Sequence, residues 1–277
     1  MISKVLVTGG TGFIGRHVVK ALLARSLKIH LIVRSRYSID STIRNMVEIT
    51  ETTDLFHQSH AWWETMLTGT DAVVHLAWYV ENDYLVSPKN IECCIGTLRM
   101  AEVIRRSQLT HLVAIGTCLE YKPSLDLLNV TDTVMPDTIY GVAKATTYTV
   151  LQEQLTSSCT KFAWCRVFYL NGEGARNESL LPRLHHAFHT GEPMVVRNPE
   201  MVLDYMRVED AARQISETLL HGRKGIINIC SGVGVTVREI VENLRKKSRF
   251  PNSVSYSANQ IEDNPATRIG KPSFGYN

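Results

Sequence analysis

Tyr140 and Lys144 are the two residues of this chain whose types and spacing most directly suggest catalysis. Residues four apart lie on the same face of a helix, so the helix that we predict over residues 140–155 places the phenol beside the ammonium group. A phenol with an ordinary pKa near ~10 is a poor base at neutral pH, and a neighbouring positive charge lowers that pKa. The pair could therefore exchange a proton with a carbonyl or carbinol oxygen. A surface tyrosine and lysine without a catalytic role is the alternative, because this spacing often arises by chance.

A threonine upstream of this pair supports the catalytic interpretation. The apolar run at residues 111–115 predicts a strand, and Thr117 lies just beyond its carboxyl end. Ligands of open parallel sheets bind in the crevice at that edge. The Thr117 hydroxyl could there form a hydrogen bond with the reacting oxygen. The sequence therefore indicates Thr117, Tyr140 and Lys144 as candidate catalytic residues.

A glycine-rich turn near the start of the chain predicts a dinucleotide site. Residues 8–15 read TGGTGFIG, between an apolar strand at residues 4–8 and a helical pattern at 15–24. Glycines at this spacing permit a tight turn, close approach to a pyrophosphate and close helix–strand packing, while the helix N-terminus offers unpaired N–H groups. A purely structural turn is the alternative. The candidate cofactor-binding residues of this turn are Gly9, Thr11, Gly12, Phe13, Ile14 and Gly15.

The end of the second predicted strand bears on which dinucleotide is bound. NAD-binding units usually place Asp or Glu there to bond the ribose hydroxyls. Here the strand at residues 29–33 continues as Arg34, Ser35 and Arg36. Guanidinium groups match the geometry of a phosphate, so we predict a preference for NADP(H) over NAD, with a solvated turn as the alternative. Asp54, after a further predicted strand, is a candidate for bonding the adenine edge.

Apolar runs and helical patterns alternate along the first two-thirds of the chain, which predicts an α/β fold with a Rossmann-type, doubly wound parallel sheet. Strands are expected over residues 4–8, 29–33, 72–76, 111–115 and 162–167, and helices over 15–24, 91–106 and 140–155. A helix near 208–220, a strand over 226–230 and a helix over 237–247 follow. The segment 172–199 has no regular period and is expected to form a small lobe over the site. We assign no structure to the polar tail, residues 251–277.

These elements divide the chain into a dinucleotide-binding domain and a small C-terminal substrate-binding lobe. The domain comprises residues 1–172 with about 201–233, and the lobe about 173–200 with 234–277.

The composition is that of an ordinary globular protein with a sizeable core: 277 residues, 44% hydrophobic and 21% charged. The net charge of +3 suits an anionic small molecule, while no basic run indicates nucleic acid and no apolar stretch reaches membrane-spanning length. The first strand begins too early for a secretory peptide. Six scattered cysteines without a CxxC pair favour reduced thiols, a cytoplasmic location and no metal site. His185, His186 and His189 are expected on a solvated helix rather than around a metal.

The chain resembles the extended short-chain dehydrogenase/reductases, of the NAD(P)-dependent nucleotide-sugar epimerase/dehydratase/reductase kind, over roughly residues 2–244. Besides TGGTGFIG and YGVAK, the resemblance rests on DAVVHLA at 71–77, GTL at 96–98, DYMRVED at 204–210 and NICSG at 228–232. It implies that Thr117, Tyr140 and Lys144 form the family's catalytic triad and that Lys144 also holds the nicotinamide ribose. It further implies that Leu76 and Ala77 line the cofactor groove. Two copies would associate as a homodimer through the helices near 91–106 and 140–155.

The residues that follow Thr117 bear on the reaction. Sugar dehydratases of this family carry Asp-Glu there as acid and base, whereas this chain has Cys118 and Leu119, which disfavours dehydration. The turn at 34–36 resembles the NADPH-binding turn of reductases that act on 4-keto-6-deoxy sugars. We therefore expect an NADPH-dependent reductase of a keto group on a nucleoside-diphosphate sugar, with Tyr140 as proton donor and Thr117 orienting the carbonyl. A 4-epimerase that retains its dinucleotide and a non-catalytic NADP(H)-sensing protein are the alternatives.

Three departures from the family pattern concern the substrate. Cys93 replaces an asparagine, Tyr169 replaces an asparagine that often touches the sugar nucleotide, and Leu203 replaces the arginine that grips the pyrophosphate. Phosphate binding would then fall to another arginine of this region: Arg176, Arg183, Arg197 or Arg207. We select Arg183 and Arg197 because they flank the irregular lobe, with a solvated surface as the alternative. The candidate substrate-binding residues are Trp78, Cys118, Tyr169, Asn171, Arg183 and Arg197, although Cys118 is best explained as a small buried residue.

Overall fold

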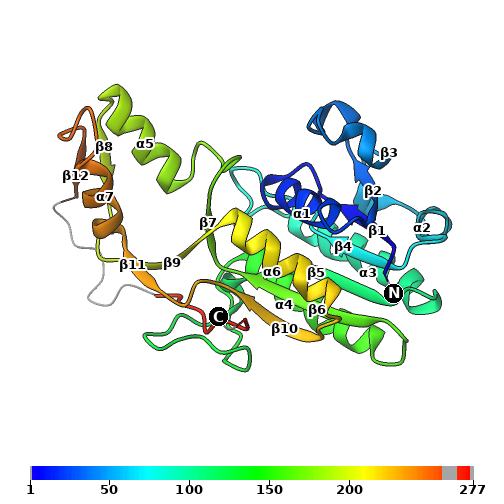
Figure 1. The fold of residues 1–277 in the computed structure, drawn as a ribbon. Coiled ribbons are helices and arrows are strands. Elements are labelled where there is room, and N and C mark those ends of the chain that lie inside the picture. Colours follow the sequence, from blue (N-terminus) through cyan, green and yellow to red (C-terminus); the bar gives the residue numbers. More distant parts are fainter. Residues whose placement is uncertain (1, 258–266, 275–277) are drawn as a thin grey trace.

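Seven parallel strands form the central sheet of the computed structural model, which describes residues 2–257 and 267–274 (Figure 1). Their order across the sheet is β10 (Gly225–Ile229), β6 (Lys161–Val167), β5 (His111–Thr117), β4 (Ala72–His75), β1 (Lys4–Thr8), β2 (Lys28–Val33) and β3 (Glu48–Glu51). The chain proceeds outward from β1 in both directions, so the strand order reverses beside β1. Ligands of open α/β sheets bind at such a point, outside the carboxyl ends of the strands.

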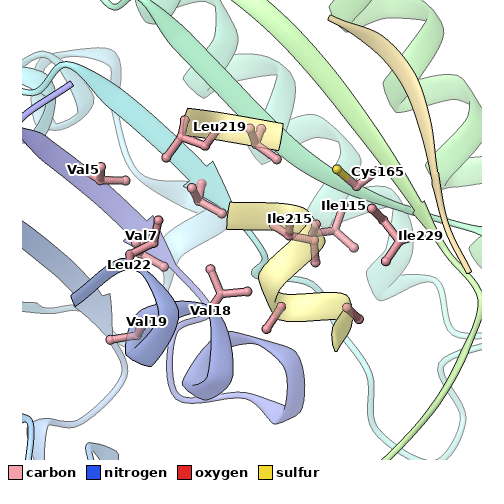
Figure 2. Packing of buried hydrophobic residues seen from close by; sticks show 14 of the residues in the cluster. Val5, Val7, Val18, Val19, Leu22, Ile115, Cys165, Ile215, Leu219 and Ile229 are labelled. Atoms are coloured by element: carbon pink, nitrogen blue, oxygen red, sulfur yellow. The ribbon is translucent and has the colours of Figure 1, made fainter. Parts of the chain in front are cut away.

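Helices cover both faces of this sheet. One face carries α1 (Phe13–Leu23) and α6 (Val208–Leu220), and the other carries α2 (His60–Leu67), α3 (Lys89–Arg106) and α4 (Ile139–Leu155). Because both faces are covered, the strands are apolar almost throughout, and alternate residues enter opposite clusters. Figure 2 shows the cluster on the first face, where Val5 and Val7 of β1 meet side chains of both helices: Val18, Val19 and Leu22 from α1, and Ile215 and Leu219 from α6.

A smaller group of elements lies to the side of the central sheet (Figure 1). It contains α5 (Leu180–Thr190), β8 (Met194–Val196), α7 (Val237–Arg245) and β12 (Val254–Tyr256). The strands β7 (Tyr169–Asn171), β9 (Val202–Arg207) and β11 (Gly234–Thr236) form a three-stranded sheet along its connections to the rest of the chain. Its apolar side chains form one cluster, which we call the small core: Leu184, Ala187, Phe188, Met194, Val196, Leu203, Val237, Val241 and Val254.

The predicted fold class is confirmed, and each predicted strand and helix is present with small shifts at its ends. The segment 172–199, in which we found no regular period, contains α5 and β8. The tail, to which we assigned no structure, contains β12, which pairs with β8. These elements are stabilised by partners distant in the sequence, which local periodicity does not reveal. Residues 258–266 and 275–277 of the tail lie outside the described residues, and the division into two domains stays a prediction.

Within the described residues, no helix has both the length and the apolar character needed to cross a membrane.

Candidate active site

Thr117 is held at the carboxyl end of β5 by the short helical turn that follows it, η4 (Cys118–Glu120). Its backbone N–H donates to Oε1 of Glu120 at 2.8 Å, and its Oγ1 accepts from the N–H of Leu119 at 3.2 Å. This reciprocal arrangement is a capping box, which fixes the angle at which the turn leaves the strand. Since Oγ1 already accepts one hydrogen bond, the hydroxyl proton of Thr117 is available to a group in the site.

Helix α4 brings Tyr140 to the same place. Oγ1 of Thr138 accepts from the Gly141 N–H at 3.1 Å and starts the helix. A Cβ on Gly141 would lie 2.8 Å from the carbonyl oxygen of Leu119, so only glycine lets the first turn of α4 approach η4 this closely. The backbone N–H of Tyr140 donates to the Leu85 carbonyl at 3.2 Å, which ties the helix to the loop after β4.

The hydroxyl group of Tyr140 lies close enough to that of Thr117 for Thr117 to act on its pKa. Burial raises the pKa of Tyr140 well above its usual range, and Thr117 acts in the opposite direction. The ring of Tyr84 packs edge-on against the Tyr140 ring, with their centroids 5.0 Å apart. In this arrangement Tyr140 is a protonated phenol at neutral pH, which is the state required of a proton donor.

Lys144 lies one helical turn after Tyr140 and is buried, with 4% of its surface exposed. Its Nζ donates to the carbonyl oxygen of Ile115 at 2.6 Å and lies 3.6 Å from the centroid of the Trp78 ring. Burial lowers the pKa of Lys144 to about 7, and the charge of Glu120 acts in the opposite direction. The structure thus brings Thr117, Tyr140 and Lys144 together, and it adds Trp78 as a contact of the lysine.

The glycine turn forms a backbone cradle of the kind that a pyrophosphate needs. Gly9 has φ of 70°, and a Cβ on it would lie 2.5 Å from the backbone nitrogen of Ala77. A Cβ on Gly15 would lie 2.1 Å from the carbonyl oxygen of Gly9. Gly12 caps α1 without a side-chain acceptor, so the first N–H groups of the helix have no capping side chain. These features fit a dinucleotide, whose phosphates would be held here by Gly9 to Gly15 beside Leu76 and Ala77.

A carboxylate that the sequence analysis missed lies against the turn after β2. The Arg36 guanidinium pairs with Glu51 at 3.2 Å, and its backbone N–H donates to the same carboxylate at 2.7 Å. Glu51 ends the neighbouring strand β3, so only the pairing of β2 with β3 places it here. Ser35 accepts from the N–H of Tyr37, and Arg34 is exposed.

Near Cys118, the residue after Thr117, the structure reveals a residue that sequence reasoning missed, Arg268. It is 8% exposed, and within the described residues its Nε and Nη2 atoms have no hydrogen-bond partner. Its Nη2 lies 3.9 Å from the carboxylate of Asp137. Burial raises the pKa of the neighbouring Tyr169, and the charge of Arg268 acts in the opposite direction. Arg268 also forms a β-bridge with Leu203. The departure at Leu203 indicated that a cation had to come from elsewhere, but nothing in the tail identified this arginine.

The remaining candidates lie around these two groups. Cys118 is 3% exposed, in an apolar cluster with Phe168, which agrees with a small buried residue. Trp78 also donates from Nε1 to the Asn90 side chain at 2.8 Å. Asp54 is exposed and accepts from His57 at 2.6 Å, and Asn171 lies on β7.

The two selected arginines lie beside the small core. Arg183 lines a hollow of about 450 Å³ that none of the three candidate catalytic residues lines, and Arg197 is exposed just after β8. His185, His186 and His189 are exposed on α5. Among residues 2–257 and 267–274, no group of three or more His, Cys, Asp or Glu side chains could hold a metal ion.

Comparison with known proteins identifies the family to which the chain belongs. The NAD dependent epimerase/dehydratase family has a model that matches residues 5–230. The chain is 23% identical to dTDP-6-deoxy-L-talose 4-dehydrogenase (NAD(+)) of Aggregatibacter actinomycetemcomitans over 259 residues, which are 89% of this chain and 93% of the relative. It is 25% identical to UDP-glucose 4-epimerase of Yersinia pestis over 301 residues, covering 95% of this chain and 88% of the relative.

Among solved structures, MoeE5 in complex with UDP-glucuronic acid and NAD shares the fold, with a TM-score of 0.84 and 21% identity over 98% of this chain and 90% of that one. The family match spans most of the chain and includes the glycine turn and all three candidate catalytic residues. The protein is therefore an enzyme of the NAD dependent epimerase/dehydratase family, an oxidoreductase-type member of the extended short-chain dehydrogenase/reductases.

Proposed function

We propose that this enzyme reduces a keto group, with Tyr140 as the proton donor. In such a reaction a bound nicotinamide dinucleotide supplies the hydride. The neighbouring hydroxyl groups of Tyr140 and Thr117 carry this proposal, because a protonated phenol lies next to a hydroxyl that can orient the carbonyl oxygen. Dehydration would need an acid and a base after Thr117, and Cys118 and Leu119 offer no carboxylate.

Lys144 supports Tyr140 in this reaction. When Tyr140 gives up its proton, the remaining phenolate is stabilised by positive charge nearby. The Nζ atom of Lys144 lies 6.0 Å from the centroid of the Tyr140 ring, and one of its hydrogen bonds goes to Ile115. An ammonium has three donors, so Lys144 can also hold the nicotinamide ribose.

The substrate that we propose is a nucleoside-diphosphate sugar carrying a keto group. A buried guanidinium with two nitrogens lacking partners in the described chain is costly unless an anion completes it, so Arg268 is suited to a phosphate. It lies beside Leu203, where the family's phosphate-binding arginine is missing, and in contact with Tyr169. This replaces our selection of Arg183 and Arg197, both of which are exposed. The name of the first relative, a dTDP-deoxysugar dehydrogenase, supports the same substrate class.

For the cofactor we propose NADP(H), with Arg34 as the ligand of the 2′-phosphate. Arg36 is engaged by Glu51, whereas Arg34 is exposed at the end of β2. Titration of the protein with NADPH and NADH tests this. We expect tighter binding of NADPH, weakened about tenfold in R34A and strengthened in E51Q, which removes a carboxylate near the phosphate. Equal or tighter binding of NADH would instead assign NAD, the cofactor bound in the MoeE5 structure.

A 4-epimerase is the second candidate function, and the likeness to UDP-glucose 4-epimerase favours it. An epimerase returns the hydride to its substrate and keeps its dinucleotide. It would therefore interconvert two sugar nucleotides without net oxidation of NADPH, and the cofactor would remain with the purified protein.

We also propose that the enzyme is a cytoplasmic homodimer. Ile91 and Ile95 on α3, and Val142 on α4, are large apolar side chains about half exposed. A second copy would cover these helices, and exposed apolar area of this kind favours association.

The decisive experiment is turnover of NADPH with a panel of keto-sugar nucleotides. We expect oxidation of NADPH by the parent protein and loss of turnover by about 10²-fold or more in Y140F, with NADPH binding retained. Tyr37, which is 80% exposed, provides the matched control: Y37F should behave like the parent. Unchanged turnover in Y140F would refute the assignment of the proton donor.

A further inference from the structure

A buried carboxylate lies directly behind the candidate catalytic threonine. Glu120 ends the turn η4 and is 0% exposed. Its Oε1 accepts from the backbone N–H of Thr117 at 2.8 Å, while the Leu119 N–H in the same turn donates to Oγ1 of Thr117 at 3.2 Å. Glu120 therefore closes the turn that orients the Thr117 hydroxyl.

Two side chains of β6 hold this carboxylate from the other side. Nε1 of Trp164 donates to both of its oxygens, at 3.0 and 3.1 Å, and Nε of Arg166 donates to Oε2 at 2.7 Å. Burial raises the pKa of Glu120, and the charge of Arg166 and the hydrogen bonds that Glu120 accepts act in the opposite direction. Glu120 is the acceptor in every one of these hydrogen bonds, which is the pattern of an ionised carboxylate. A Cβ on Gly116 would lie 2.4 Å from Oε1, so β5 passes the carboxylate at a distance that only glycine permits.

The ion pair between Glu120 and Arg166 stabilises the core little, because burying two charges costs free energy of hydration. Both side chains are buried, at 0% and 1% exposure, and buried pairs lose hydration that their attraction only partly offsets. Apolar side chains of similar volume would stabilise the fold as well or better. The position of the pair, next to the reacting groups, points to a role in the reaction.

The charge of Glu120 acts on α4, because the Trp164 ring whose Nε1 donates to Glu120 lies 5.7 Å from Nζ of Lys144. It raises the pKa of Lys144, against the effect of burial, and it also raises the pKa of Tyr140. The titratable and charged groups that face Glu120 are Arg166 on β6, Cys118 and Tyr121 beside it in the chain, and Tyr140, Lys144 and Tyr148 on α4. Those that face Lys144 are Glu120, Tyr140, His75 on β4, and Cys93 and Cys94 on α3. None of the other groups named around Glu120 or Lys144 is a carboxylate, so the negative charge near Lys144 comes from Glu120.

We propose that Glu120 is a positioning residue for the reaction, which fixes the Thr117 hydroxyl through the backbone and stabilises the ammonium of Lys144 through its charge. The first effect requires the length of a glutamate side chain, and the second requires only its charge. The consequence for turnover rests on the proposed function, whereas the effect on Lys144 exists without any substrate.

Two substitutions separate these effects. E120Q keeps an oxygen that accepts from Thr117 and removes the charge, whereas E120D keeps the charge and draws the carboxylate away from the Thr117 N–H. W164F is the matched control, because it removes one donor to Glu120, leaves both the charge and the Thr117 hydrogen bond, and keeps an aromatic ring beside Nζ of Lys144, which lies 5.7 Å from the Trp164 ring. The titration of Lys144 is followed by NMR of the lysine side chains in the substrate-free protein, with K144M identifying the signal.

We expect the titration midpoint of Lys144 to fall by about one pH unit in E120Q and to stay near the parental value in W164F, because a neighbouring opposite charge shifts a pKa by roughly that amount or more.

In turnover, E120D should lower kcat about tenfold with little change in the pH profile. E120Q should move the alkaline limb of the profile to lower pH, because loss of a negative charge lets the proton-donating pair deprotonate earlier.

A parental Lys144 midpoint in E120Q would overturn the electrostatic part, and a parental kcat in E120D would overturn the positioning part. E120D decides the second point even if E120Q fails to fold. If the parent turns over no keto-sugar nucleotide, the proposed function fails, while the Lys144 titration still decides whether Glu120 sets the charge of that lysine.

Discussion

The two sides of the candidate site differ in how many of their polar groups already have partners. On the reaction side, Thr117, Tyr140 and Lys144 each form a hydrogen bond with another part of the chain, Tyr140 through its backbone N–H. On the side that we propose for the substrate phosphate, which we call the phosphate side, Arg268 is buried with two nitrogens that have no partner in the described residues. The first side is assembled by the fold itself, and the second is suited to being completed by a ligand. Substitutions should therefore affect the two sides differently.

The largest effect is expected on the reaction side. Lys144→Met keeps a side chain of similar length but removes the ammonium, so the phenolate formed on Tyr140 loses its neighbouring positive charge. We expect kcat for keto reduction to fall by about 10²-fold or more. Lys89→Met is the control, because the Lys89 ammonium also lies over an aromatic ring, that of Tyr79 at 4.7 Å, but on the surface. If Lys144→Met keeps the kcat of the parent, Lys144 does not stabilise the phenolate, and the reaction side is no more sensitive to substitution than the phosphate side.

On the phosphate side, the effects on binding and on stability should have opposite signs. Arg268→Met is expected to raise KM for the sugar nucleotide about 10- to 100-fold, since hydrogen bonds to charged groups contribute about 1.5–3 kcal/mol. The ligand-free variant should melt at a higher temperature, because an incompletely paired buried cation is gone. Arg197→Met, at an exposed position, should change neither quantity. If KM rises in Arg197→Met but not in Arg268→Met, the phosphate ligand is Arg197, which was selected from the sequence.

A smaller effect is expected from the residue that anchors the Arg268 segment. Asp204 is 0% exposed, and its carboxylate accepts from the backbone N–H groups of Gly270 at 3.1 Å and Gly232 at 3.0 Å. Both donate to Oδ2, while Oδ1 accepts from the backbone N–H of Ser231 at 2.8 Å, so in Asp204→Asn the new amide nitrogen faces a backbone N–H group at either position. We expect KM to rise about tenfold or less with kcat nearly unchanged, and the Gly270 amide to exchange faster with solvent. Faster exchange without a change in KM would separate this anchor from phosphate binding.

The smallest effect concerns stability on the reaction side. The pKa of Lys144 is lowered by burial to about 7, below that of an unfolded lysine, so between these values the unfolded chain binds the extra proton. Stability from this group therefore rises as pH increases from about 7 toward 10, and the cost of the buried charge is fully present below pH 7. Lys144→Met should exceed the parent in melting temperature at about pH 6, by a margin that shrinks toward pH 9. If the difference in melting temperature between Lys144→Met and the parent is the same at pH 6 and pH 9, Lys144 does not lose its proton over this range.

The sequence could locate the reaction side because its signals are local. Tyr140 and Lys144 share one helix, Thr117 ends a strand, and the glycines lie within one turn. Other features depend on pairing between distant segments: Glu51 reaches Arg36 only through the neighbouring strands β2 and β3, and Arg268 reaches Tyr169 from the tail.

Helix α5 illustrates the same limit for the fold. Its apolar residues Leu184, Ala187 and Phe188 have helical spacing, but Pro182 and three histidines interrupt the pattern.

The roles that we assigned to individual site residues stay predictions.

The bridge between Leu203 and Arg268 has a consequence for comparing family members. Two backbone positions that lie side by side offer alternative origins for one guanidinium, so, on the phosphate role that we propose for Arg268, a relative with arginine on the strand and another with arginine on the tail would bind the same phosphate. Aligned column by column, such proteins would look as though one of them had lost its ligand, whereas in space the charge has only moved to the adjacent segment.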